Sequence, residues 1–214
     1  MAIAFDVSSK SSGSSISSIT WAHTCSGSDR VLIVFVGKLE SAISSVTYND
    51  VALTKLWEYD GTANDFTAWY LIAPATGEHD VVVTFGSSQT NVVVAATSYT
   101  GVNQSTPFGT VASTEGYSAA PSVNVSSATG ELVVDACFTS STLTVDESQT
   151  ERFNSNYFSG RLAGSSEAGA ATVTMSWTRG TTGWWAIAGV SLKPAAASGL
   201  ALPIIQNYNN CMRH

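Results

Sequence analysis

Charged residues are scarce in this chain, and cations are the scarcest among them. Only 12% of the residues are Asp, Glu, Lys or Arg, whereas an average soluble domain has about 25%. The 9 Lys and Arg residues stand singly along the chain, and the net charge is −7. Phosphate backbones and anionic membrane surfaces are both bound by clustered cations. The composition therefore argues against nucleic acid and membranes as partners.

Long apolar runs are missing as well. The longest, residues 31–36, is far shorter than the roughly 20 residues of a membrane-spanning helix. The opening residues 1–6 have neither the basic start nor the apolar stretch of a secretory signal. We therefore expect a soluble protein that is made without a signal peptide. Its hydroxyl-rich, Lys-poor composition is nevertheless typical of proteins that work outside cells.

Cysteine and histidine are too few and too scattered for an obvious metal or nucleophilic site. They are Cys25, Cys137, Cys211, His23, His79 and His214. No zinc-binding spacing, GxSxG motif or HExxH motif occurs. We expect no catalytic residue, no metal and no cofactor, and hence a protein that is not an enzyme. Cys137 lies in an apolar segment and is expected to be buried, while a Cys25–Cys137 disulfide remains an open possibility.

Hydroxyl residues and strand-forming residues dominate instead. The chain has 32 Ser and 24 Thr, and 44% of its residues are hydrophobic. Residues 171–178 alternate strictly between apolar and hydroxyl side chains, which indicates a strand with one face inward. No window repeats apolar residues with the period of a helix. The predicted fold class is all-β: an antiparallel, jelly-roll-like β-sandwich.

The remaining strands are predicted from short runs of β-branched and aromatic residues. They span residues 3–7, 16–24, 30–37, 46–48, 51–59, 66–72, 80–85, 91–100, 122–125, 131–139, 150–153, 157–162 and 184–192. The segments 30–37 and 91–100 are apolar almost throughout, which predicts central strands covered on both faces. Asn49-Asp50 predicts a two-residue turn. The segments 171–178 and 184–192 are expected to form a hairpin through residues 180–183.

A weak internal repeat divides the chain into two similar half-units. Segments 30–37, 66–71, 81–85 and 91–102 are echoed by 131–138, 157–162, 172–177 and 184–194. Residues 103–121, with Pro and Gly, predict a long surface loop between the halves. We expect a β-sandwich domain over residues 1–194 and a C-terminal linker and arm over 195–214.

Two groups of residues are candidates for contacts with a partner. The terminal arm carries an apolar patch, which suggests that the arm docks on the body of the protein or on a neighbouring subunit. The patch consists of Leu202, Pro203, Ile204, Ile205 and Tyr208. Adjacent strand residues point to opposite faces, so only one of Trp184 and Trp185 can lie in the core. The other is a candidate for a glycan platform or for a subunit interface.

Two acidic positions are open to more than one interpretation. Asp135, among apolar neighbours, is either an outward-facing strand residue or a buried, partnered carboxylate. The segment 60–65 offers oxygen ligands but lacks the spacing of an EF-hand loop, so an acidic turn is favoured over a calcium site. Carboxylates for a glycan hydrolase, a minor alternative, fall mainly at expected turns, where solvated side chains are normal.

Several segments resemble a β-sandwich domain that recurs in bacteriophage virion proteins and in large bacterial surface proteins. They are residues 3–6, 46–56, 69–85 and 95–109, and the resemblance covers roughly residues 3–194. It implies a β-sandwich and favours a homotrimer, and it brings no catalytic residues with it.

These observations lead to one principal hypothesis and one alternative. The principal one is a non-enzymatic structural protein of a bacteriophage virion: a capsid decoration (cement) protein, or a tail or tail fibre component, that assembles with other virion proteins. Such proteins are made in the host cytoplasm and released by lysis, which fits a chain without a signal peptide. The alternative is a carbohydrate-binding or adhesin module on a virion or cell surface, which would bind a host-surface glycan.

Overall fold

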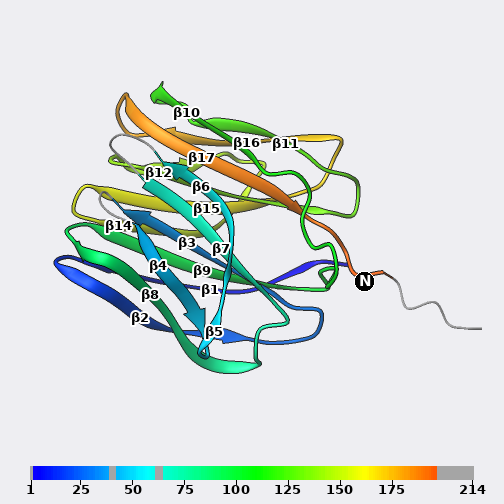
Figure 1. Ribbon diagram of the computed structural model, residues 1–214. Coiled ribbons are helices and arrows are strands. Elements are labelled where there is room, and N and C mark those ends of the chain that lie inside the picture. The colour runs from blue at the N-terminus through cyan, green and yellow to red at the C-terminus, as the bar shows by residue number, and fades with distance from the viewer. Residues whose placement is uncertain (1, 39–41, 61–64, 197–214) are drawn as a thin grey trace, which may run out of the picture.

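The computed structural model describes residues 2–38, 42–60 and 65–196, and this part of the chain consists of strands joined by turns and loops, without helices (Figure 1). The strands of the first half are β1 (Ala4–Gly13), β2 (Ile16–Cys25), β3 (Val31–Lys38), β4 (Ile43–Tyr48), β5 (Val51–Ala52), β6 (Thr54–Asp60), β7 (Asp65–Ile72), β8 (Gly77–Gln89) and β9 (Val92–Thr100). Those of the second half are β10 (Ala112–Ser118), β11 (Ser122–Ser126), β12 (Leu132–Thr139), β13 (Leu143–Val145), β14 (Thr150–Tyr157), β15 (Gly160–Ala168), β16 (Thr172–Arg179) and β17 (Gly183–Leu192). The all-β prediction is confirmed.

Each half is a sandwich of one inner and one outer antiparallel sheet. In the first half, inner sheet 1 has the order β1-β9-β3-β7-β6 and outer sheet 1 has β2-β8-β4-β5. In the second half, inner sheet 2 has the order β10-β17-β12-β15-β14 and outer sheet 2 has β11-β16-β13. The strands are nested: the first strand of each half pairs with its last, the second with the next to last, and the third with β7 or β15. The prediction of two similar half-units is confirmed by this shared order.

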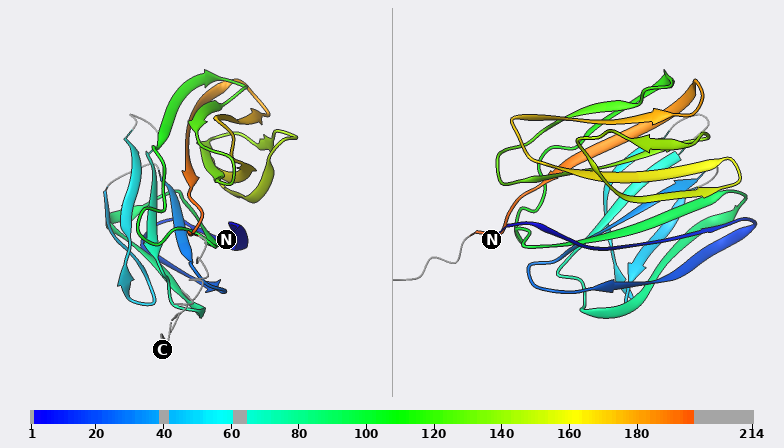
Figure 2. Two further views of the ribbon diagram at one scale, coloured as in Figure 1. Left: turned by 90° about the vertical axis from the view of Figure 1, so that its right-hand side faces the viewer. Right: turned by 180° about the vertical axis from the view of Figure 1, so that it is seen from behind.

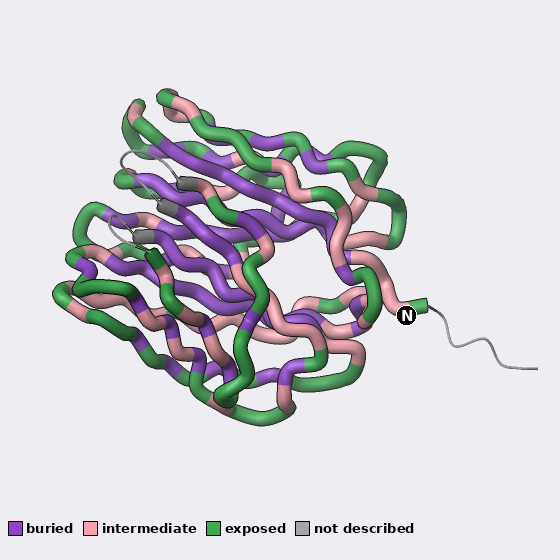
Figure 3. The backbone as a smooth tube through the Cα atoms, in the orientation of Figure 1, coloured by how far each residue is buried: buried purple, intermediate pink, exposed green. Residues whose placement is uncertain are grey.

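The two inner sheets face each other, so the described structure has four layers. Along β3, Val31, Ile33 and Phe35 contribute to the core between the halves, while the alternate residues 32, 34 and 36 pack toward outer sheet 1. Figure 2 shows the two sandwiches side by side, and Figure 3 shows buried residues concentrated along the inner strands. Strands covered on both faces need continuous apolar sequence. The prediction that segments 30–37 and 91–100 are central strands is therefore confirmed.

The inner sheets approach closely where a large side chain of one half meets a glycine of the other. The Phe138 ring lies where a Cβ on Gly37 would be, and Gly160 leaves the same kind of space for Val93. Phe153 stacks on Phe35 from across the interface, with ring centroids 5.3 Å apart. These complementary shapes let large side chains of one half pack against the backbone of the other, as a close-packed core requires.

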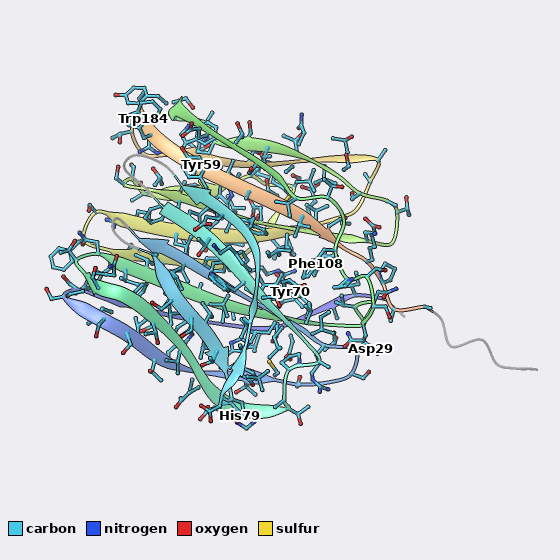
Figure 4. All side chains as sticks on the ribbon, viewed as in Figure 1. Asp29, Tyr59, Tyr70, His79, Phe108 and Trp184 are labelled. Atoms are coloured by element: carbon cyan, nitrogen blue, oxygen red, sulfur yellow. The ribbon has the colours of Figure 1, made fainter. Side chains whose placement is uncertain are left out.

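The connection between the halves is fastened to both of them. Phe108 forms a β-bridge with Leu192 of the second half, and its ring lies edge-on to Tyr70 of the first half, with centroids 4.8 Å apart (Figure 4). Gly101 has a φ of 69°, and a Cβ there would collide with the carbonyl oxygen of Ala2. Glycine is therefore required where the connection leaves β9 beside the N-terminal segment.

The expected surface loop 103–121 contains a strand, which corrects the sequence prediction. Residues Ala112–Ser118 form β10, whose ladder with β17 runs from Ala112 opposite Gly189 to Ser118 opposite Gly183. Its sequence, ASTEGYS, has no alternation of apolar and polar residues, and its side chains are exposed or half-buried. An edge strand of this kind is held by backbone pairing, which leaves little signal in the sequence.

The hairpin predicted for segments 171–178 and 184–192 is also wrong. Strand β16 pairs with β11 and β13 in outer sheet 2, whereas β17 pairs with β10 and β12 in inner sheet 2. Residues 180–182 therefore arch from one sheet to the other. Both strands turn apolar side chains to the core between the sheets, so their sequence patterns look the same as those of a paired hairpin.

Other boundaries differ where polar residues form strands or a turn interrupts a strand pattern. The predicted strand 157–162 is interrupted by a turn at residues 158–159 between β14 and β15. The predicted strand 51–59 divides at Leu53 into β5 and β6, which belong to different sheets. The Asn49-Asp50 turn is confirmed, with φ values of 48° and 61° that suit a two-residue hairpin.

Candidate functional site

One end of the second half collects most of the exposed aromatic side chains of the described structure. We call it the distal end, because it lies opposite the N-terminus (Figure 1). It is formed by the turns at residues 119–121, 140–142, 158–159 and 180–182. The ladders bring these turns together, since Ser118 is opposite Gly183 and Thr139 is opposite both Trp185 and Arg161.

The two adjacent tryptophans point to opposite faces of β17, as predicted. Trp184 is 58% exposed, whereas Trp185 is 9% exposed and packs in the core of the second half. The Trp185 Nε1 donates a hydrogen bond of 2.9 Å to the Ser118 hydroxyl. Figure 4 shows Trp184 at the start of β17, at the edge of the molecule. Of the two candidates, Trp184 is therefore the one available for a partner.

Trp184 is joined by an aromatic residue that the sequence analysis did not select. Tyr117 on β10 is its register partner, is 60% exposed, and lies edge-on to it with ring centroids 5.3 Å apart. Tyr117 was not predicted as a candidate, because the segment that contains it was expected to be a loop. The two rings form a continuous exposed aromatic surface.

Phe158 adds a third exposed ring at the distal end. It is 72% exposed and lies edge-on to Tyr157, with ring centroids 4.7 Å apart. Its φ of 46° lies in the left-handed region, which is unusual for a bulky side chain. This residue was also missed, because the turn that holds it was predicted to belong to the strand 157–162.

A buried arginine supports the distal end from below. The Arg179 guanidinium donates from Nε to the Thr139 hydroxyl at 2.6 Å, and from Nη1 to the carbonyl oxygens of Ser118 and Thr181 at 3.0 and 2.9 Å. A Cβ on Gly183 would collide with this guanidinium. Burial lowers the pKa of Arg179 from its ordinary value. The arginine thus joins the ends of β10 and β12 to the turn at residues 180–182.

A second arginine lies in the same region. Arg161 donates from Nη1 to the carbonyl oxygens of Phe158 and Gly160, at 2.8 and 3.0 Å, and so braces the turn between β14 and β15. Its Nε is buried without a hydrogen-bond partner among the described residues. Arg161 stands opposite Thr139 in the ladder, and Thr139 is the residue whose hydroxyl accepts from Arg179. The register places Arg161 on the same face of inner sheet 2 as Thr139 and the buried Trp185, whereas Trp184 and Tyr117 lie on the other face.

Asp135 is a buried, partnered carboxylate, which decides between the two interpretations of the sequence. It is 1% exposed; Oδ1 accepts from the Ser165 backbone N–H at 2.8 Å and from its hydroxyl at 2.6 Å, while Oδ2 accepts from Trp177 Nε1 at 2.7 Å. Gln149 extends the network, donating to the Ser165 hydroxyl and accepting from the Ser176 N–H. Burial raises the pKa of Asp135 to about 6, against the opposing effect of these hydrogen bonds.

The first half encloses a different polar group, His23. Its Nδ1 lies 2.8 Å from the Ser9 hydroxyl, which also accepts from Trp21 Nε1 at 3.0 Å. The Nε2 of His23 is buried and has no partner among the described residues. Burial lowers the pKa of His23 to about 4, only partly opposed by the charge of Asp6. The ring is therefore neutral near pH 7.

Asp6 lies at the edge of the same region. Its carboxylate accepts hydrogen bonds from the Ser26 backbone N–H and hydroxyl and from the Ser98 hydroxyl. Burial alone would raise the pKa of Asp6, but these hydrogen bonds outweigh it and the net shift is downward. The carboxylate connects β1 to the start of the turn after β2.

The thiols lie apart in different cores. Cys25 and Cys137 are both free and buried, Cys25 in the core of the first half and Cys137 in that of the second. The burial expected for Cys137 is confirmed. Burial raises the pKa of both thiols, so they stay protonated and unreactive.

Two further predictions concern residues that lie wholly or mostly outside the part of the chain that the structure describes. The arm residues Leu202, Pro203, Ile204, Ile205 and Tyr208 lie outside the described residues, as does Cys211. Most of the acidic segment 60–65 is likewise outside them. Both remain predictions.

A polar hollow of about 340 Å³ lies on the first half. Its lining residues are Ala22, Asn49, Asp50, Glu78, His79, Asp80 and Val82. The Nε2 of His79 lies 3.1 Å from the Thr76 carbonyl oxygen. Among the described residues, no group of three or more His, Cys, Asp or Glu side chains is placed to hold a metal ion. A helix of the length and apolarity needed to cross a membrane is likewise not found in the described ranges.

Comparisons with known proteins give no relative from which a role could be taken. No family model matches the chain. No curated protein and no solved structure matches it either. The distal end is the candidate site, because it carries the exposed rings of Tyr117, Phe158 and Trp184.

Proposed function

We propose that this protein is a non-enzymatic structural component of a bacteriophage virion, such as a capsid decoration protein or a tail or fibre subunit. The observation that carries the proposal is the nested strand order, which occurs twice in one chain. Three nested strand pairs divided between two sheets resemble the pattern of a jelly roll, a fold used by viral capsid proteins and by lectins. The resemblance of residues 3–194 to virion proteins supports the same assignment.

The placement of the titratable groups supports a structural role. Asp135 and His23, whose pKa values are strongly shifted, lie inside the sandwiches and bond to the protein's own atoms. Shifted groups at an active site would be expected in a cleft, within reach of a substrate. Here the shifts follow from burial in the cores.

The packing of the halves also supports a role in assembly. Two sandwiches that share a core between their inner sheets form a rigid block, and the surface of such a block can serve as a fixed contact face. We propose that the protein forms a homotrimer and that this trimer assembles with other virion proteins. The apolar arm around Leu202–Tyr208 would take part in these contacts. The protein would be made in the host cytoplasm and released by lysis.

The experiment that tests this proposal combines oligomer mass with location. The purified full-length protein should have the mass of a trimer by light scattering, and an antibody against it should label particles released by lysis of the source cells. A monomer that is absent from such particles would overturn the proposal. A variant that lacks residues 197–214 serves as the control for the contribution of the arm.

The second candidate is a carbohydrate-binding or adhesin module, and the exposed Tyr117–Trp184 pair favours it. Exposed aromatic faces pack against the C–H groups of sugar rings while the sugar hydroxyls remain solvated or hydrogen-bonded. Binding on a glycan array that is lost in Trp184→Ala and kept in Val51→Ala would support it. Val51, 51% exposed on the first half, is a control at a distance from the rings.

A further inference from the structure

Tyr117 and Trp184 lie on the face of inner sheet 2 that is turned toward the first half. Side chains alternate between the faces of a strand, so Trp184 shares its face with Val190 and Leu192, which are buried in the core between the halves. Tyr117 stands opposite Trp184 in the ladder and therefore has the same orientation. Because the two rings are 60% and 58% exposed, the cover that the first half provides ends before this corner of the sheet.

A carboxylate stands on the same face, beside the two rings. Glu115 lies two positions before Tyr117 on β10, so both side chains point the same way. It stands opposite Ala186, which makes Trp184 its diagonal neighbour across the ladder, a spacing that long side chains can bridge. Glu115 is exposed, and its carboxylate has neither a hydrogen bond nor an ion pair with another described residue. One unpaired carboxylate and two ring faces therefore border the same corner.

The arrangement of the two rings suits a cation. They meet edge-on, with an interplanar angle of 74° and centroids 5.3 Å apart, and so present faces in two directions rather than one flat platform. Ring faces carry negative charge density and attract ammonium groups. Among the described residues, the cations that stack on rings are Lys55 on Trp69 and Arg152 on Phe5. The rings of the corner have no such partner there, which leaves their faces to a cation from outside.

We propose that the corner formed by Glu115, Tyr117 and Trp184 binds a carbohydrate that carries amino groups, with a sugar ring on Trp184 and an ammonium group between Tyr117 and Glu115. This inference rests on the second candidate function and names the class of its ligand. The C–H face of a sugar packs on an aromatic ring, whereas the ammonium is attracted both by ring faces and by the carboxylate. The net charge of −7 likewise favours a cationic ligand over an anionic one.

The test uses the full-length protein and two oligosaccharides of equal length. Glucosamine oligomers carry an ammonium group on each ring in mildly acidic buffer, and N-acetylglucosamine oligomers have the same rings without the charge. Both are titrated into the protein by calorimetry. The glucosamine oligomer should bind about tenfold more tightly, the gain expected from one cation–π contact together with one exposed ion pair. Trp184→Ala should abolish binding of both oligomers.

Substitutions of carboxylates separate the corner from the overall charge of the protein. Glu115→Gln keeps the shape of the side chain and should weaken binding of the glucosamine oligomer about threefold, with no change for the acetylated oligomer. Glu115→Asp keeps the charge and should retain part of the preference. Glu147→Gln, at an exposed carboxylate in the turn before β14, changes the net charge by the same amount and should bind like the wild type. All three variants should melt at the wild-type temperature, as is usual for exposed positions.

The outcomes distinguish the amino group from the carbohydrate-binding function. Equal binding of the two oligomers, lost in Trp184→Ala, would overturn the amino group as the determinant while the carbohydrate-binding function survives. Binding of neither oligomer, or binding that Trp184→Ala leaves intact, would overturn both. A preference that falls equally in Glu115→Gln and Glu147→Gln would show attraction to the overall charge and would overturn the site. Competition by oligolysine as strong as that by the glucosamine oligomer would show a site for basic peptides and would overturn the carbohydrate.

Discussion

The two halves of this protein share one strand order and differ in what single positions do within it. When β3 is aligned end to end with β12, Asp135 of the second half takes the place of Val34 in the first. The registers then place Asn91 at the position of Trp184, and Ser14 at that of Tyr117. The strand order is repeated, whereas the buried carboxylate of Asp135 and the exposed Tyr117–Trp184 pair occur only in the second half.

This difference separates the determinants of topology from those of chemistry. The nested order is common to both halves, whose single residues differ at these positions. A buried Asp requires partners, which the second half supplies from Ser165 and Trp177. An exposed ring needs no partner inside the protein. A position at the exposed end of a strand can therefore hold a Trp without a change in the sandwich.

The largest expected effect comes from the core that both halves share. Phe138→Ala should lower the free energy of unfolding by about 3–5 kcal/mol, because it leaves a cavity against Gly37 and Gly160. Urea denaturation followed by tryptophan fluorescence measures this loss. With the contact between the halves weakened, the single transition should separate into two. A loss below about 1 kcal/mol would show that the inner sheets do not support each other.

The pH dependence of the first half should come mainly from His23. Its pKa is about 4 in the folded protein and 6.5 in the unfolded chain, so the unfolded chain takes up the proton first. Stability should therefore fall as the pH is lowered from about 7 to 4, by roughly 3 kcal/mol in total. The low pKa of Asp6 adds a loss at still lower pH. Denaturation at a series of pH values should show this slope in the single variant Asp135→Asn. The slope should be absent from the single variant His23→Phe.

The second half should respond to pH in the opposite direction through Asp135. Its pKa is about 6 when folded and 3.8 when unfolded, so the folded protein binds the proton first. The stability that this provides is complete below about pH 4 and is lost as the pH rises through 6, by roughly 3 kcal/mol. His23→Phe should therefore become more stable on acidification from pH 7 to 4. A flat profile in that variant would contradict the shift assigned to Asp135.

The smallest effect on stability is expected at the exposed ring pair. Trp184→Ala should change the free energy of unfolding by less than about 0.5 kcal/mol, as is usual for exposed positions. Trp185→Ala should cost roughly 3 kcal/mol, because this ring fills the core of the second half. Thermal melts of the two variants compare neighbouring residues on opposite faces of one strand. Equal losses would show that Trp184 is also part of the packing.

Some features of the candidate site could be predicted from the sequence, and others had no signal there. The alternation of strand side chains showed that one of Trp184 and Trp185 must leave the core, but not which one. Tyr117 was missed because β10 is a polar edge strand, held by its ladder with β17 rather than by an apolar pattern. Phe158 was missed because an aromatic residue at a hairpin turn resembles a strand residue.

The sequence by itself determined the all-β class, the repeated half-units and the central strands, because a strand covered on both faces must be apolar throughout and a half-covered one must alternate. Only the tertiary structure decided how the strands pair. Segments 171–178 and 184–192 have the patterns of a hairpin and yet lie in different sheets, since the same inward face suits either arrangement. It also decided that Asp135 is enclosed, that the two buried thiols lie in different cores, and that Tyr117 and Trp184, distant in sequence, are in contact. Burial and proximity depend on which segments pack together, and a local pattern does not contain that information.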